Sequence, residues 1–428
     1  MSHLNRYKRF NQLSTALPKE MEALVLSGKG FDNLALSRIP VPEPGPGQFL
    51  ARVDAVFACA SDGKLIELGE EHPLMAGWDP ARWPVAIGHE GCITAVKVGE
   101  DLKGHIKTGN SYAVQPAINI GPINHRERYT NALALEKVAV GCTLGGLFAE
   151  YVLITEEVIR TDSLIPYDTG KVPYFAMAFS EPLSCVYSAQ NQIPHVYKQG
   201  SNEPREVRLG LRRGGVTLIL GAGPMGILHA DLAMMYQPRA IVISEPIVER
   251  REQAENILRA KSVERNIELT ITSPDELKAV LRLVTNGHGV DDCITALGVA
   301  KIQEQSIGYL GKGGVASFFG GAKAGESIIS VDTRRIHYDG ITLIGSSGGD
   351  PSDIQAVVKL LEAGEISPER YVRRVGGLDA ALGLVKSIRA QEFFGKGLIY
   401  PHVRRPLFEV GSWSFEEENA FLEKNLAG

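Results

Sequence analysis

The chain has 428 residues, of which 44% are hydrophobic, so it can form two domains and bury a substantial core. A formal net charge of -5 gives no general attraction to nucleic acid or to an anionic membrane, so we expect neither as a partner. The five cysteines lack paired short spacings, which argues against a disulfide framework. The polar N-terminus resembles neither a secretory signal nor a membrane anchor, and no apolar run could span a bilayer. These features fit a reducing cytoplasm best.

The N-terminal part of the chain is rich in predicted β-strands. The apolar patterns predict strands over residues 21–27, 49–57, 93–98, 111–114 and 148–154. The proline-glycine segment 41–47 cannot be a central strand, because proline lacks a backbone donor and fixes φ. Cys59, His89 and Glu90 therefore lie at strand ends or in the loops between these strands.

Less regular stretches interrupt this pattern. Residues 68–83 and 117–146 contain glycines and polar residues without a clear period and are predicted to be loops. Residues 178–185, which include Glu181, lead into a stretch that is predicted to be helical through Gln190. The polar, proline-interrupted segment 193–213 is predicted to be a linker or a surface insertion.

A glycine motif between a strand and a helix is the strongest signal in the chain. The apolar run 216–220 leads into Gly221-Ala222-Gly223-Pro224-Met225-Gly226, and apolar residues at helical spacing follow. In a dinucleotide site the first glycine makes the turn, the second lets the pyrophosphate approach the backbone, and the third lets the helix pack on the strand. The phosphate then faces free N–H groups at the positive end of the helix.

A carboxylate follows at the position where the ribose is typically bound. The predicted strand 240–244 ends at Glu245, about 20 residues past the third glycine. Glu245 should repel a 2′-phosphate, which favours NAD over NADP. Arg250 and Arg251 leave NADP possible, although a solvated helix face also explains them. An ordinary glycine turn is the alternative to the whole motif.

Strands and helices continue to alternate beyond Glu245, which predicts a doubly wound parallel sheet. The patterns predict helices over 249–260 and 274–284, and strands over 268–271, 290–296, 315–319 and 341–344. The tail from Asp350 is not needed by this sheet and should return to the N-terminal region. The predicted fold is thus α/β, with a β-rich catalytic domain over 1–190, a dinucleotide-binding domain over 191–345 and a C-terminal return over 346–428.

Cys59, His89 and Glu181 could together bind one zinc ion. A catalytic zinc typically has three protein ligands and leaves its fourth position to water or a substrate oxygen. Each residue also has a plain structural explanation, as a small buried thiol, a core histidine or a carboxylate at a helix entry. The spacing of these three residues in the sequence does not by itself indicate that they bind the same metal ion.

Six motifs occur in an order that resembles the zinc-dependent medium-chain dehydrogenase/reductase family. They are the segment 41–47, Cys59-Ala-Ser-Asp, Gly88-His-Glu-Gly, Phe148-Ala-Glu-Tyr-Val, Ser180-Glu-Pro-Leu and the glycine motif at Gly221. The resemblance covers about residues 21–349 and is strongest to the polyol and sugar dehydrogenase branch, particularly the L-sorbose 1-phosphate reductases. It implies a GroES-like catalytic domain, a Rossmann domain, and a cleft between them that holds zinc and NAD(P).

The resemblance assigns roles to single residues. Cys59 and His89 take the places of zinc ligands, and Glu90 that of a glutamate that binds zinc directly or through water. Glu181 stands where polyol dehydrogenases carry a glutamate and alcohol dehydrogenases a cysteine. Ser61 takes the place of the hydroxyl that passes the substrate proton toward solvent.

The chain departs from the family around this centre. Asp62 is similar to a family residue that supports the metal site. Lys64 is a departure, because some relatives carry at this position a histidine that relays the proton. Lys64 could meet a substrate phosphate or be a solvated surface lysine. Only Cys142 remains where many relatives hold a structural zinc with four cysteines, so we expect one zinc per chain. Gly348-Gly349 replaces the arginine-tyrosine pair of polyol dehydrogenases, which argues against unmodified sorbitol.

Other residues could border the substrate. Trp78 and Trp83 lie in a segment longer than the family leads us to expect, and they could wall the pocket. Arg334, Arg335 and His337 could meet an anion, although a surface role is the plainer explanation.

The resemblance implies reversible hydride transfer between NAD(H) and a secondary alcohol or ketone of a sugar, polyol or sugar phosphate, with zinc polarising the substrate oxygen. One alternative is a zinc-free, NADPH-dependent quinone or enone reductase of the same fold, which would not need Cys59, His89 and Glu181. The other is a dinucleotide-binding protein without turnover. The family also implies a homodimer or homotetramer that assembles through the sheet edge near residues 328–344.

Overall fold

The computed structural model describes residues 17–119, 122–135 and 137–426. The described residues do not include most of the polar N-terminal segment. They also leave out residues 120, 121 and 136 of the predicted loop 117–146. The chain divides into two compact units, which we call the β-rich unit (Met1–Ser184 with Asp350–Gly428) and the parallel-sheet unit (Cys185–Gly349). No helix of the described part is long and apolar enough to cross a bilayer.

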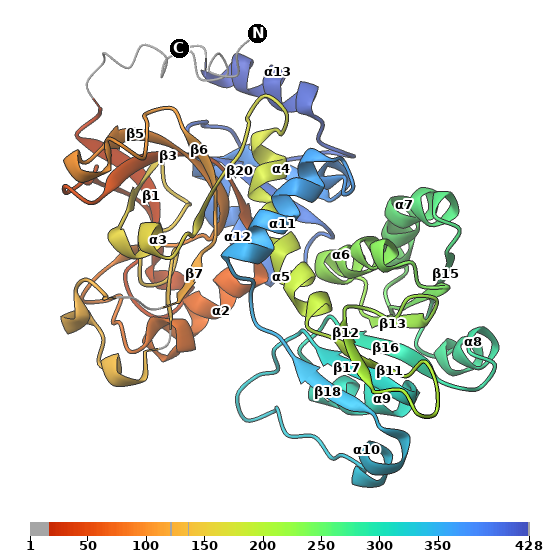
Figure 1. Cartoon of the computed structure of the whole chain (residues 1–428). Helices are drawn as coiled ribbons and strands as arrows, with labels where there is room; N and C mark the ends of the chain where they lie inside the picture. Colours follow the sequence, from red (N-terminus) through yellow and green to blue (C-terminus); the bar gives the residue numbers. More distant parts are fainter. Residues whose placement is uncertain (1–16, 120–121, 136, 427–428) are drawn as a thin grey trace. The chain divides into compact units, whose positions relative to one another are not determined.

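Three sheets lie in the described part of the β-rich unit (Figure 1). The largest has eight strands: its path runs β10-β6-β5-β3-β20-β19-β21, and β9 pairs with β3. Their bounds are β3 Phe49–Ala58, β5 Glu90–Val98, β6 Ser111–Val114, β9 Tyr151–Ile154, β10 Leu164–Pro166, β19 Val372–Gly377, β20 Lys396–Tyr400 and β21 Phe408–Glu409. The smaller sheets are β2-β1-β4 and the pair β7-β8, formed by β1 Glu20–Leu26, β2 Leu34–Pro40, β4 Val85–Ala86, β7 Ala117–Asn119 and β8 Lys137–Ala139.

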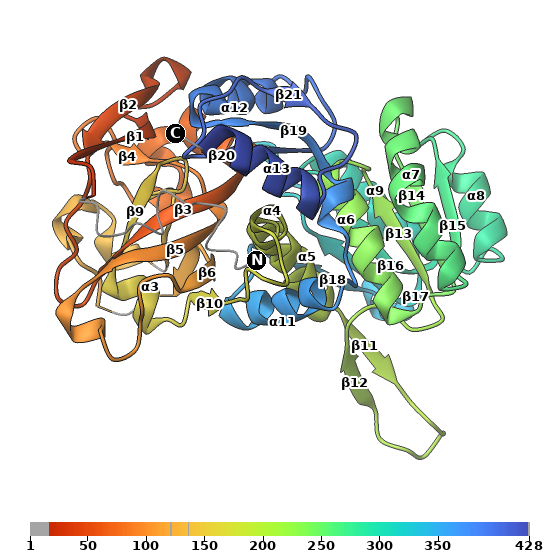
Figure 2. The same cartoon turned by 90° about the horizontal axis from the view of Figure 1, so that it is seen from above.

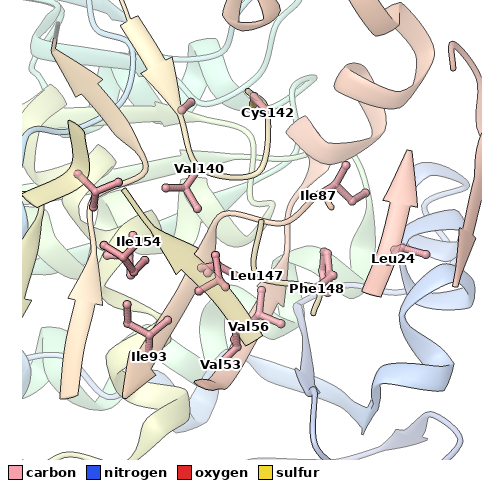
Figure 3. Packing of buried hydrophobic residues seen from close by; sticks show 14 of the residues in the cluster. Leu24, Val53, Val56, Ile87, Ile93, Val140, Cys142, Leu147, Phe148 and Ile154 are labelled. Atoms are coloured by element: carbon pink, nitrogen blue, oxygen red, sulfur yellow. The ribbon is translucent and has the colours of Figure 1, made fainter. Parts of the chain in front are cut away.

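The core of this unit lies around β3, which is buried along its whole length. Figure 3 shows apolar side chains from distant segments packed together, including Val53 and Val56 of β3, Ile93 of β5 and Phe148. Cys142 belongs to the same core, and its burial raises the pKa of its thiol to about 12. The tail completes the sheet, because β20 pairs antiparallel with β3 and continues the same buried layer.

Helices and short 3-10 turns connect these strands. The helices are α2 Ala60–Leu68, α3 Glu156–Arg160, α4 Tyr174–Ala178, α5 Ser180–Asn191, α11 Pro351–Glu362, α12 Ala381–Arg389 and α13 Phe415–Leu426. The 3-10 turns are η2 Phe31–Asn33, η3 Gly69–Glu71, η4 Pro73–Met75, η5 Glu100–Leu102, η6 Arg126–Arg128, η7 Ala132–Ala134, η9 Pro368–Arg370 and η10 Leu378–Ala380. No helix is predicted from the sequence between residues 58 and 68, whereas the structure has α2 there, with Ser61 and Lys64 on it. Gly63 and the polar residues at the start of this helix weaken the apolar pattern by which a helix is recognised in a sequence.

The second unit contains one six-stranded parallel sheet of order β15-β14-β13-β16-β17-β18. Numbered from β13, this is the order 3-2-1-4-5-6 of a doubly wound dinucleotide-binding fold. The strands are β13 Val216–Leu220, β14 Ala240–Ser244, β15 Glu268–Thr272, β16 Val290–Thr295, β17 Leu310–Phe318 and β18 Thr342–Gly345. The helical segments are α6 Pro224–Ala233, η8 Met234–Tyr236, α7 Val248–Glu264, α8 Leu277–Val284, α9 Ala300–Tyr309 and α10 Thr333–Asp339. The predicted combination of a β-rich domain with a doubly wound sheet is confirmed.

The segment predicted as a linker or insertion contains an antiparallel hairpin. Its strands are β11 Pro194–Tyr197 and β12 Glu206–Leu209, and Figure 2 shows the hairpin projecting from the rest of its unit. The hairpin is anchored at its base, where buried His195 Nε2 lies 2.8 Å from Asp292 Oδ1 on β16. A surface insertion therefore describes this segment, and a structureless linker does not.

Candidate metal centre and dinucleotide loop

Strand pairing brings the predicted cysteine and histidine together. Phe57 of β3 pairs with Glu90 of β5 in antiparallel register. Cys59 follows the end of β3 and His89 directly precedes β5, so both lie at the same end of this strand pair. Gly88 has φ of +97°, and a Cβ there would come within 2.5 Å of the Phe148 ring, so the turn before His89 requires glycine.

Three potential ligand atoms meet at this point. One atom each from Cys59, His89 and Glu90 lie within 4.8 Å of one another, and no other such group occurs among the residues that the structure describes. Ser61 Oγ lies 3.0 Å from Cys59 Sγ and 3.1 Å from His89 Nε2. A thiolate, an imidazole and a carboxylate are ligand types that zinc takes, so these donors suit a zinc ion.

Asp62 holds both the cysteine and the histidine from the first turn of α2. Its Oδ2 accepts a hydrogen bond from the Cys59 backbone N–H at 2.9 Å, and its Oδ1 lies 3.0 Å from His89 Nδ1. The side chain is almost completely buried. This contact at Nδ1 leaves Nε2 as the nitrogen that can face a metal, and a carboxylate in this position typically fixes the ring of a ligating histidine.

Buried charges surround the cluster. Burial raises the pKa of the Cys59 thiol, and the neighbouring Glu90 raises it further. Burial alone would lower the pKa of His89, but Asp62 and Cys59 outweigh it and hold this pKa well above its ordinary value. A divalent cation would favour the thiolate and the neutral imidazole, because both must lose their protons to bind metal.

Lys396 forms a buried ion pair with Glu90, which is not among the contacts predicted from the sequence. Its ammonium lies 5.6 Å from the centre of the Phe57 ring, at the start of β20. Burial would lower the pKa of Lys396, but Glu90 and Cys59 raise it overall, so the ammonium form persists. A lysine that opens the otherwise apolar strand Lys396–Tyr400 is the only signal in the sequence that could have identified it.

Glu181 lies outside the group of mutually close ligand atoms. It is in the first turn of α5, largely buried, and its charge contributes to raising the pKa of Lys396. The structure thus brings Cys59, His89 and Glu90 together with Ser61 beside them. Glu181 is an additional carboxylate in electrostatic range of Lys396.

The glycine motif has the geometry of a phosphate-binding loop. Gly221 follows β13 with φ of +99°, which favours glycine, and Gly223 caps α6, whose first two residues are Pro224 and Met225. A Cβ on Gly226 would lie 1.9 Å from the Gly221 carbonyl oxygen, whereas a Cβ on Gly223 would meet nothing within 4 Å. The space at Gly223 is what a phosphate needs to approach the backbone.

Glu245 lies at the end of β14 and contacts this loop. Its Oε2 accepts a hydrogen bond from the Ala222 N–H at 2.7 Å, and its Oε1 accepts one from the Ile247 N–H at 3.1 Å. Arg250 Nη1 lies 3.9 Å from Oε1, while Arg251 donates to the carbonyls of Glu245 and Pro246. Glu245 therefore braces the loop, and Arg251 has a structural role.

The basic residues near the last strand are also placed by local contacts. Arg335 donates to the carbonyls of Ile307 and Leu310 and pairs with Asp339 at 3.0 Å. Arg334 lies over the ring of Tyr338, 5.1 Å from its centre. These contacts favour a structural role for Arg335.

Two family models match the chain in tandem. The alcohol dehydrogenase GroES-like domain matches residues 45–163, and the zinc-binding dehydrogenase domain matches residues 224–363. The first match covers Cys59, His89 and Glu90, and the second begins inside the glycine loop. The chain belongs to the zinc-type medium-chain dehydrogenase/reductase family, a family of oxidoreductases, as the sequence motifs predict.

Curated relatives match almost the whole chain. Mannitol-1-phosphate 5-dehydrogenase of Aliivibrio fischeri is 29% identical over 92% of this chain and 92% of its own length. L-sorbose 1-phosphate reductase of Klebsiella pneumoniae is 26% identical over 94% of this chain and 93% of its own length.

Solved structures show the same fold. The 2R,3R-butanediol dehydrogenase of Bacillus subtilis is 22% identical, with a TM-score of 0.69 over 89% of this chain and 99% of its own. A protein of Sinorhizobium meliloti described as a zinc-binding dehydrogenase bound to NADP is 24% identical, with a TM-score of 0.70 over 90% of this chain and 100% of its own.

Proposed function

We propose that the protein is a zinc-dependent, NAD-linked dehydrogenase that acts reversibly on a secondary alcohol or ketone of a sugar or polyol phosphate. The observation that carries this proposal is the cluster of Cys59, His89 and Glu90 in a chain that also has a complete glycine loop. Zinc chemistry and a nicotinamide cofactor together suit alcohol oxidation, because one stabilises charge on oxygen and the other accepts hydride.

Cys59 and His89 would hold the zinc, together with one carboxylate. Glu90 is the carboxylate near both ligand atoms, and Glu181 is the alternative assigned by family position. When bound, zinc acts as a Lewis acid that lowers the pKa of the substrate hydroxyl. We expect one catalytic zinc and no structural zinc, because Cys142 is part of the hydrophobic core.

Three side chains of the protein prepare this chemistry. Ser61 Oγ, beside Cys59 and His89, would accept the proton that leaves the substrate hydroxyl and pass its own proton toward solvent. Asp62 keeps the imidazole oriented. Lys396 balances the charge of Glu90 and so limits how many negative charges crowd the centre.

Two independent features support a phosphorylated substrate. Relatives that match 84 to 94% of the chain are named for mannitol 1-phosphate, L-sorbose 1-phosphate and D-arabitol phosphate. Gly348 and Gly349 also leave the chain without the arginine-tyrosine pair of the enzymes that bind unmodified polyols.

Glu245 supports NAD as the cofactor, because its buried carboxylate at the end of β14 would repel a 2′-phosphate. Arg250, 3.9 Å from that carboxylate, keeps NADP as the second choice. We also infer a homodimer or homotetramer, and a reducing cytoplasm as its location, since none of the five cysteines forms a disulfide.

The zinc-free quinone or enone reductase is the weaker alternative, because it gives no reason for the clustered ligand atoms. A dinucleotide-binding protein without turnover is weaker still, because it would not need Ser61 beside the cluster. NAD-linked oxidation of a panel of free and phosphorylated polyols tests the proposal. We expect turnover that the Ser61→Ala variant lowers about 100-fold in kcat, whereas the half-buried control Ser37→Ala on β2, outside the cluster, leaves it unchanged. Failure to oxidise any member of the panel, with NADPH-dependent reduction of quinones instead, would contradict the proposal.

A further inference from the structure

The hairpin β11–β12 has an apolar face that points away from its own unit. Residues opposite each other in an antiparallel pair share a face, and successive residues alternate between the two faces. The polar face is fixed against the unit by His195, which is buried and contacts Asp292 of β16. The other face, which we call the apolar hairpin face, consists of Pro194, Val196, Val207 and Leu209.

This orientation is the reverse of what a two-stranded hairpin needs in water. Val196, Val207 and Leu209 are 58%, 62% and 67% exposed, and Figure 2 shows the hairpin projecting from its unit. Two strands alone are only marginally stable in water, and apolar side chains on them gain free energy when they are buried. Neighbouring exposed apolar side chains typically mark a surface that binds another protein.

A second group of exposed apolar side chains lies in the same unit. Ile328, Ile336 and Tyr338, which we call the edge region, precede β18, the last strand of the parallel sheet. Strand β11 lies against β17, and β17 pairs with β18, so the hairpin and the edge region belong to the same side of the sheet. Within one chain the hairpin does not cover the edge region, because the side chains of both stay exposed.

Charge indicates which surface the apolar hairpin face meets. Residues 194–213 contain five lysines and arginines but only two acidic residues, whereas the whole chain has a net charge of -5. Two hairpins packed on each other would bring like charges together, while a hairpin packed on the remaining, acidic part of a second copy would not. Around a two-fold axis, each hairpin can meet the edge region of the other chain, so that both apolar groups are covered in a closed dimer.

We propose that the hairpin is an arm for self-association, whose apolar face packs on the edge region of a second copy of this chain, and reciprocally. Assembly through these surfaces rests on the homo-oligomer of the proposed function, but it depends on neither zinc nor turnover. Failure of the dehydrogenase assignment would therefore leave it standing, and a monomeric protein could still be a dehydrogenase.

Sedimentation equilibrium of the whole chain measures this association. Val207→Glu combined with Leu209→Glu puts carboxylates on the apolar hairpin face and should weaken self-association at least about 100-fold. The matched control, Val263→Glu combined with Leu283→Glu, changes exposed apolar residues on α7 and α8 and should leave it unchanged. Far-UV circular dichroism should be the same for all three proteins, because the four side chains are exposed. Equal association of the hairpin variant and wild type, or equal weakening by the control, would contradict the proposal.

Photo-cross-linking identifies the surface that the hairpin meets. Isotope-labelled chains that carry p-benzoylphenylalanine in place of Val196 are allowed to exchange subunits with unlabelled wild type, and joined peptides that contain both isotopic forms come from different copies. We expect such peptides to contain residues 328–338. Peptides that join two hairpins, or links within one chain only, would overturn the proposal. A monomeric wild type that sediments with vesicles of phosphatidylserine and phosphatidylcholine would overturn it too, and would assign the apolar hairpin face to a membrane.

Discussion

Gly223 offers a way to test cofactor binding without disturbing the fold. Its φ of -69° suits any residue, and an added Cβ would meet nothing within 4 Å. The Gly223→Ala variant should therefore fold like wild type, but its methyl group would occupy the approach of the pyrophosphate. We expect the Kd for NADH, measured by fluorescence titration, to rise at least about tenfold.

The matched control is Gly308→Ala in α9, where an added Cβ also meets nothing within 4 Å. It should leave the Kd unchanged and stabilise the helix slightly, because alanine has the higher helix propensity. Equal affinity of Gly223→Ala and Gly308→Ala for NADH would show that the dinucleotide does not approach this part of the loop.

His229 on α6 predicts a pH dependence of stability. Burial lowers the pKa of its imidazole to about 3. As the pH falls below the unfolded-state pKa of 6.5, the unfolded chain takes up a proton that the folded chain does not bind until about pH 3. This residue alone should therefore lower the unfolding free energy by about 1.4 kcal/mol per pH unit in that window, and its contribution is complete above pH 6.5.

Urea unfolding at several pH values between about 7 and 5 measures this slope. His229→Asn should show a shallower slope than wild type, while the exposed control His288→Asn should show the wild-type slope. Identical slopes in all three proteins would mean that His229 is protonated in the folded state.

At the scale of elements, α13 closes the β-rich unit through one buried carboxylate. Glu418 accepts hydrogen bonds from the Tyr174 and Phe175 N–H groups at 3.0 and 2.8 Å, and from Tyr400 Oη at 2.9 Å. It thereby caps α4, the short helix that precedes α5. Removing it would leave these donors buried without an acceptor.

We therefore expect Glu418→Ala to lower the unfolding free energy by about 2 to 4 kcal/mol in urea titration. Glu416→Ala, at an exposed position of the same helix, should change it by less than about 0.5 kcal/mol. Comparable effects of the two substitutions would show that the cap contributes little to stability.

Much of the fold follows from local patterns, and the rest depends on distant contacts. Strand β3 and the unit from β13 to Glu245 were predictable because apolar runs and glycines mark them directly. Helix α2 was not, because Gly63 weakens its pattern and the capping box between Cys59 and Asp62 is what defines its start.

Some residues of the candidate site could likewise be predicted from the sequence, and others could not. Cys59, His89 and Glu90 were identified from motifs, and strand pairing explains why they meet. Lys396 is 306 residues from Glu90 along the chain, so only the pairing of β20 with β3 reveals it as a partner.

At the scale of the whole molecule, the edge strand β18 pairs only with β17 in the described structure, and exposed apolar side chains lie nearby in the sequence. Ile328 is 90% exposed and Tyr338 68% exposed. We predict a dimer or tetramer in sedimentation equilibrium, which Ile328→Glu combined with Tyr338→Glu should shift toward monomer.

Leu283→Glu on α8 is the matched control, because Leu283 is 78% exposed but lies on another helix of the same unit. It should keep the wild-type mass. A monomeric wild type, or a double variant that assembles like wild type, would contradict assembly through the region 328–344.

The zinc content per chain tests the central claim most directly. Mass spectrometry of metal released from purified wild type, from Cys59→Ser and from His89→Ala gives this number without any assumption about the substrate. We predict one zinc per chain in wild type and less than about a tenth of that in both variants, because each loses a ligand of a three-residue set. Wild type without zinc, or variants that keep it, would contradict the account and favour the zinc-free reductase.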